Sequence, residues 1–115
     1  MTENDIIVTA LRLIGVAGHD DTATGDMEAI GSQFLAGIYD EIVAEFWTTV
    51  DDDGVETVDA EWTLASVPTI AGTALAQVLA HDIAPVFSVA APPRGWLRLG
   101  QTLRQATASP DAVFY

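Results

Sequence analysis

The chain has 115 residues, half of them hydrophobic, with no cysteine, no lysine and a formal net charge of −13. This length suits one domain with a real core, so disorder is excluded for the body of the chain. The lack of cysteine excludes a disulfide framework and a thiolate metal site. The acidity argues against wrapping duplex DNA, because proteins that do so neutralise phosphates with lysine and arginine.

The first helix is predicted over residues 3–15 by apolar residues at helical spacing. Thr2 and Asp5 form a capping-box pattern at its start. Gly15 suits the left-handed residue that ends a helix, with Val16 folding back as its apolar partner.

The second helix, residues 25–47, has the strongest helical periodicity in the chain. Thr24 is expected to cap its N-terminus. Within it, Gly31 and Gly37 either weaken the helix or permit close packing.

Residues 48–67 break the helical period. Two short stretches with β-branched residues flank the acidic turn Asp51, Asp52 and Asp53, so an extended hairpin or a long loop is expected. The spacing of the acids does not match an EF-hand. A solvated acidic turn is therefore predicted rather than a calcium site.

The third helix, residues 69–84, is almost uncharged and is expected to be central. Pro85 should kink or stop it. A pair of prolines opens the fourth helix, residues 93–107, and residues 109–115 read as a tail with an aromatic end.

Together these elements predict a mainly α fold, a small four-helix bundle with an extended loop or hairpin between helices 2 and 3 and a C-terminal tail. Residues 1–108 form the helical domain, with the excursion at 48–67, and residues 109–115 form the tail. Ile70 is expected to face inward with the third helix. The predicted core consists of Ile14, Phe34, Ile38, Ile42, Leu75, Leu79 and Ile83.

Catalytic and metal-binding signatures are weak. His19 and His81 each lie beside aspartates, but their spacing fits no known ligand set, and a loop histidine and a helix-surface histidine are the simpler interpretation. We expect no enzyme activity, no cofactor and no metal. With no signal peptide and no apolar run of about 20 residues, we also expect a soluble protein made in the cytoplasm.

Aromatic residues separate into two groups. Trp47 and Trp62 lie in amphipathic segments, and we expect them to pack in the core. The last helix and the tail combine arginines with aromatics, the residue types enriched at interface centres; the alternative for the tail is a frayed end. The predicted interface with another subunit or protein therefore comprises Arg94, Trp96, Arg98, Arg104, Phe114 and Tyr115.

The order of these patterns resembles the head-to-tail adaptor (connector) proteins of tailed bacteriophages, and most of all the tail accessory factor of short-tailed phages. The resemblance covers roughly residues 5–106. It is carried by apolar patterns: the opening ALRLIGV at 10–16, the acid-rich turn, the long helix ending in Glu45-Phe46-Trp47, the excursion, Pro68, and the alanine-rich segment 74–87.

The resemblance implies a structural virion protein at the neck, where a commonly dodecameric ring lies under the portal and extends the DNA channel toward the next tail component. Its partners would be the portal protein, a downstream tail or neck protein and further copies of itself. DNA would pass without specific binding, since carboxylates on a channel wall repel phosphates. No membrane partner is implied.

The charge is distributed unevenly, and this leaves alternatives open. Residues 1–61 hold fifteen of the 17 acidic residues and only Arg12 as a base, whereas the other three arginines lie at 94–104. Opposite charges on the two parts would suit head-to-tail contact around a ring. An acidic DNA mimic or inhibitor that binds a basic partner is the first alternative, and a small helical domain from a salt-adapted organism is the second.

Overall fold

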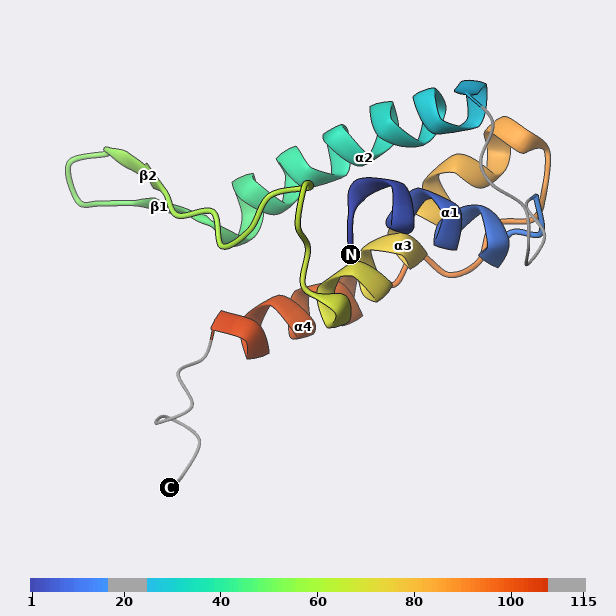
Figure 1. Ribbon diagram of the computed structural model, residues 1–115. Coiled ribbons are helices and arrows are strands. Elements are labelled where there is room, and N and C mark those ends of the chain that lie inside the picture. Colours follow the sequence, from blue (N-terminus) through green and yellow to red (C-terminus); the bar gives the residue numbers. More distant parts are fainter. Residues whose placement is uncertain (17–24, 108–115) are drawn as a thin grey trace.

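The structure, a computed structural model, describes residues 1–16 and 25–107, with side chains as far as residue 104. The described part is mainly helical with one small sheet, as predicted (Figure 1). The predicted cap at Thr24 and the tail at 109–115 lie outside it. In chain order the elements are α1 (Glu3–Leu13), α2 (Gly25–Phe46), β1 (Thr48–Val50), β2 (Glu56–Val58), α3 (Thr69–Ile83), the 3-10 helix η1 (Ala84–Phe87) and α4 (Trp96–Thr107).

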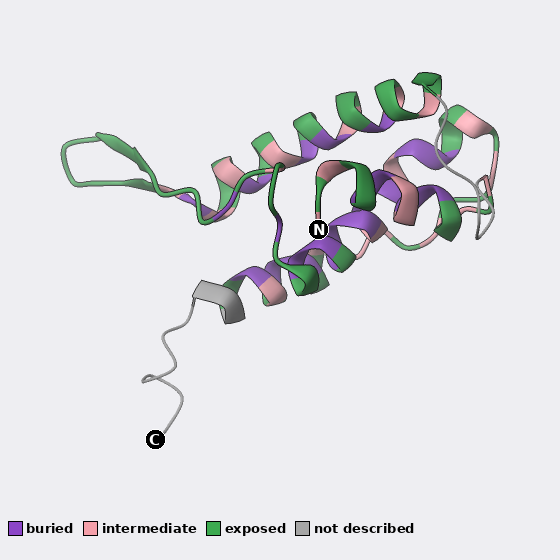
Figure 2. Ribbon diagram, viewed as in Figure 1, coloured by how far each residue is buried: buried purple, intermediate pink, exposed green. Residues whose placement is uncertain are grey.

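Helix α3 lies at the centre of the fold and contacts each of the other three α-helices. Nine of its residues are buried, and burial extends along most of its length (Figure 2). Four of the nine are alanines, whose small side chains let the neighbouring helices approach closely. The prediction that the least charged helix is central is confirmed.

Helix α1 has the predicted capping box at its start and the predicted left-handed glycine after its end, but it is shorter than predicted. The Asp5 carboxylate accepts a hydrogen bond from the backbone N–H of Thr2 at 2.9 Å, and the Thr2 hydroxyl accepts one from Asp5 N–H at 3.2 Å. The hydrogen bond from the Thr2 backbone first, and the Thr2 side chain second, hold the pKa of the Asp5 carboxyl below its usual value. Gly15 has φ +76° and Val16 folds back onto the last turn. The helix ends two residues before the predicted boundary.

Two other boundaries differ from the prediction for backbone reasons. Helix α4 begins at Trp96 rather than at residue 93, because Gly95 has φ +74°, which no helical residue adopts. The α-helical part of α3 ends at Ile83, just before Pro85, and continues as the tighter η1 turn.

Most of the predicted core is buried; two of its members are only partly buried, and Ile70, which was also expected to face inward, is exposed. Ile14 is only partly buried because it lies beyond the end of α1, and Phe34 is partly buried because Leu35 fills the core position on α2. Ile70 is 74% exposed, since residues 68–70 at the start of α3 all face solvent. The confirmed core residues are Ile38, Ile42, Leu75, Leu79 and Ile83.

The two glycines of α2 have different roles. A Cβ atom at Gly31 would lie 2.7 Å from Ile7 Cγ2, so this glycine lets α1 and α2 pack closely. A Cβ atom at Gly37 would meet no atom within 4 Å. Close packing therefore applies to the first glycine and not to the second.

Candidate interaction site: the hairpin arm and helix α4

Residues 48–61 form a projecting hairpin, here called the hairpin arm, which extends beyond the end of α2 (Figure 1). Its two strands pair antiparallel, with Thr48 opposite Val58 and Val50 opposite Glu56. The turn is fixed by the Asp51 carboxylate, which accepts hydrogen bonds from the backbone N–H groups of Asp53 at 2.9 Å and Val55 at 2.8 Å. The predicted hairpin or loop is thus a short hairpin with an acidic turn.

The base of the arm is held by three aromatic rings. Trp47 and Trp62 meet edge to face at 4.8 Å between centroids, and Tyr39 of α2 lies 5.8 and 5.9 Å from them. The Tyr39 hydroxyl donates to the Trp62 carbonyl oxygen at 2.7 Å, and Asp59 N–H donates to the Trp47 carbonyl oxygen at 2.8 Å. Both legs of the arm are therefore tied to the body at the same place. The prediction that Trp47 and Trp62 pack in the core is confirmed.

The indole N–H groups of Trp47 and Trp62 have no hydrogen-bond partner within the described residues, although both atoms are buried. A buried unpaired donor costs about 1–3 kcal/mol. The apolar contact of the two rings must outweigh this cost, since a buried tryptophan removes about 150–250 Å² of surface from water. Packing rather than polar bonding therefore holds the arm.

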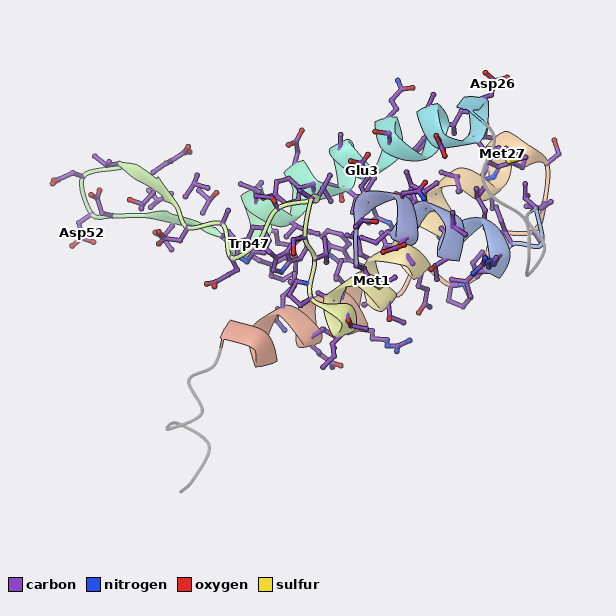
Figure 3. The ribbon with its side chains drawn as sticks, viewed as in Figure 1. Met1, Glu3, Asp26, Met27, Trp47 and Asp52 are labelled. Atoms are coloured by element: carbon purple, nitrogen blue, oxygen red, sulfur yellow. The ribbon has the colours of Figure 1, made fainter. Side chains whose placement is uncertain are left out.

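Charge and exposure set the arm apart from the rest of the molecule. It contains six acidic residues and no basic residue, and residues 49–61 are all exposed (Figure 2). Asp52 lies at the tip and Trp47 at the base (Figure 3). The predicted acidic loop, Asp51, Asp52 and Asp53, thus forms the outermost turn of the arm.

The segment that begins α4 is attached by a polar network. The Arg94 guanidinium bonds Asp82 of α3 at 3.1 Å and Glu41 of α2 at 3.2 Å, and it lies 4.7 Å from the Trp96 ring centre. The hydrogen bonds that Arg94 donates to Asp82 raise the pKa of Arg94 above its usual value, while partial burial opposes the shift. Trp96 Nε1 donates to Glu45 at 3.0 Å.

The two other arginines of this region also contact their own chain. Arg98 Nη1 donates to the Gln77 side chain at 3.1 Å, and the Arg104 guanidinium lies 5.8 Å from the Phe46 ring centre. The structure therefore brings four of the six predicted interface residues together on or beside α4. Phe114 and Tyr115 lie outside the described residues, and an interface role for the set stays a prediction.

Helix α4 has an exposed side that sequence reasoning did not single out. Leu99 and Leu103 are buried against the body, so Leu97 points the opposite way and is 82% exposed. The helical spacing of Leu99 and Leu103 is the feature of the sequence that could have identified this exposed side. We call the exposed side the α4 outer face; its members are Leu97, Arg98, Gln101 and Arg104.

A shallow groove of about 380 Å³ runs between α2 and α3. Its apolar part is formed by Phe34 and Ile38 beside Gly37, and its polar end by the Glu41 and Asp82 carboxylates. Both carboxylates already bind Arg94. The groove thus ends at the polar network that attaches α4.

The described residues contain no group of three or more His, Asp or Glu side chains placed to hold a metal ion. His81 Nδ1 donates to the Pro92 carbonyl oxygen at 2.7 Å and so fixes the loop before α4. His19 lies outside the described residues.

Among the described residues one stretch, Thr69–Phe87, is long and apolar enough to cross a membrane by length and composition, contrary to the expectation that no such stretch exists. In the structure 56% of it is buried inside the protein. A central core helix meets the same criterion, and α3 occupies that place here.

The chain was compared with known proteins at three levels. No protein family, no curated protein and no solved structure matches it. The likeness to phage adaptors therefore rests on the sequence pattern alone.

Proposed function

We propose that this chain is a head-to-tail adaptor of a tailed bacteriophage, a structural and non-enzymatic protein of the virion neck. In this proposal its four helices form a small bundle, and copies assemble into a ring under the portal. The ring extends the DNA channel and provides the surface on which the next tail component binds. The protein would be made in the host cytoplasm and function in the virion.

The observation that carries the proposal is the hairpin arm. Residues 49–61 are all exposed, so they add little to the core, yet the arm is firmly tied at Trp47 and Trp62. A two-stranded hairpin standing alone is marginal in water. An arm that is anchored at one end and free at the other suits contact with another molecule of an assembly.

The charge supports a conduit rather than a DNA-binding surface. At −13, the chain repels phosphates over most of its surface. A channel wall benefits from this repulsion because DNA must slide past without adhering. The expectation that DNA passes without specific binding is part of this proposal.

The alternative, an acidic DNA mimic, needs carboxylates presented together on one rigid face. Here Glu41 and Asp82 hold Arg94, and Glu45 accepts the Trp96 N–H. These three carboxylates are engaged within the chain and stabilise α4. Their use in the fold favours the adaptor over the mimic.

The test is reconstitution with the portal protein encoded by the same genome. Mixed with assembled portal, the purified chain should form a second ring stacked on the portal axis in negative-stain electron micrographs. A genome that encodes no portal, or a chain that stays apart from the portal, would contradict the proposal. Displacement of random duplex DNA from a basic DNA-binding protein would support the mimic instead.

A further inference from the structure

The hairpin arm has a mixed apolar and acidic face. The register places Val50, Glu56 and Val58 on the same side of the two-stranded sheet, because residues opposite one another point the same way and alternate residues share a face. Val50 is 62% exposed and Val58 is 54% exposed. The acidic turn lies immediately beyond them, so this side offers two valines bordered by carboxylates.

The α4 outer face has the opposite pattern. Leu97, Gln101 and Arg104 follow one another at helical spacings of four and three, which places them in one stripe, with Arg98 beside it. Leu97 supplies the apolar centre, and the two arginines supply positive charge. In the described residues the remaining arginines lie elsewhere: Arg94 is held in the network that attaches α4, and Arg12 belongs to α1.

These two surfaces do not meet within one chain. The arm is anchored at Trp47 and directs its tip, with Asp52, away from the helices (Figures 1 and 3). Trp47 and Trp62 fix that direction through both legs. The arm of one molecule therefore reaches the α4 outer face only of another.

We propose that the hairpin arm of one copy docks on the α4 outer face of the next copy, with Val50 and Val58 against Leu97 and the acidic turn against Arg98 and Arg104. The inference rests on the proposed ring and names the contact that builds it. The occupant is a second copy because the charges are complementary, six acids against two arginines. Two arms facing each other would repel, and so would two α4 outer faces.

The contact joins two different surfaces of identical chains, so it is heterologous. In an open chain of copies, one end copy keeps an unused arm and the other end copy keeps an unused α4 face until the chain closes on itself. A closed ring satisfies both surfaces of every copy. This is the symmetry that an adaptor needs.

The chain has no cysteine, so introduced cysteines report contacts without background. The double variant Val50→Cys/Leu97→Cys should give a ladder of disulfide-linked species on oxidation, because a disulfide forms only between Cα atoms within about 7 Å. The matched control is Val50→Cys/Leu13→Cys, since Leu13 is also exposed, at 55%, but lies on α1. Both are oxidised alone and on the portal, and are separated on a non-reducing gel.

A ladder confined to Val50→Cys/Leu97→Cys supports the contact. Within that background, Arg98→Glu should reduce the ladder by roughly fivefold, the upper range for one exposed ion pair. Asp52→Arg, in the acidic turn that the contact places against Arg98, should restore it. No ladder in either sample, or an equal ladder in the control, overturns the contact.

The same samples separate this inference from the proposed function. A ring on the portal without the specific cross-link leaves the adaptor function standing and refutes the contact. A specific ladder without any portal-bound ring refutes the adaptor function and supports the contact. The circular-dichroism spectrum of each variant shows that it is folded.

Discussion

The hairpin arm and α4 are both attached to the helical body through tryptophan, yet the two attachments use different chemistry. Trp47 and Trp62 are buried with unpaired indole N–H groups, whereas Trp96 is half-buried and donates to Glu45. Arg94 adds two ion pairs beside it. Apolar packing therefore fixes the arm, and a polar network fixes the start of α4. We therefore expect the stability of the arm's attachment to depend on side-chain volume, and the stability of the α4 attachment to depend on charge.

The largest expected effect is on the base of the arm. Trp47→Ala should lower the free energy of unfolding by about 3–5 kcal/mol, because it removes a buried aromatic ring and leaves a cavity. Val50→Ala, near the exposed end of β1, should change it by less than about 0.5 kcal/mol. Urea unfolding followed by circular dichroism measures both. Similar losses for the two variants would show that the arm is held along its length and not at its base.

A smaller effect is expected where α4 is attached. Arg94→Ala leaves the Asp82 and Glu41 carboxylates facing each other without their shared cation, and should cost about 1–2 kcal/mol, since the pairs are partly exposed. Arg98→Ala removes one exposed hydrogen bond to Gln77 and should cost less than about 0.5 kcal/mol. The same urea titrations compare them. If both losses were equal, the network around Arg94 would have no special role in attaching α4.

The smallest effect tests the indole groups directly. Trp62→Phe loses ring volume but also removes an unpaired buried donor, so the two changes offset each other and the net change should stay within about 1 kcal/mol. Trp96→Phe loses the hydrogen bond to Glu45 with no such gain, and should cost about 1 kcal/mol at low salt. Raising the salt concentration should shrink the second loss and leave the first unchanged. A salt-dependent loss at Trp62 would place an unrecognised charge beside its ring.

Sequence reasoning predicted the arm better than it predicted α4. Periodicity and turn chemistry are local, so the helices, the turn at Asp51 and the burial of Trp47 could be read from neighbouring residues. The partners of Arg94 lie 12 and 53 residues away along the chain, so no local pattern shows that this arginine is paired inside the protein. The start of α4 was misplaced for a different reason, because helical spacing does not reveal that Gly95 is left-handed.

The most direct measurement of the proposed assembly is the light-scattering mass of the wild-type chain as a function of salt concentration. Copies with a net charge of −13 repel one another, so screening by salt should promote any nonspecific association. Contacts between the acidic arm and the arginines of α4 should weaken instead. We predict a mass of several chains at about 50 mM salt that falls toward that of one chain at about 500 mM. A mass that rises with salt, or stays at one chain throughout, would contradict assembly through these two surfaces.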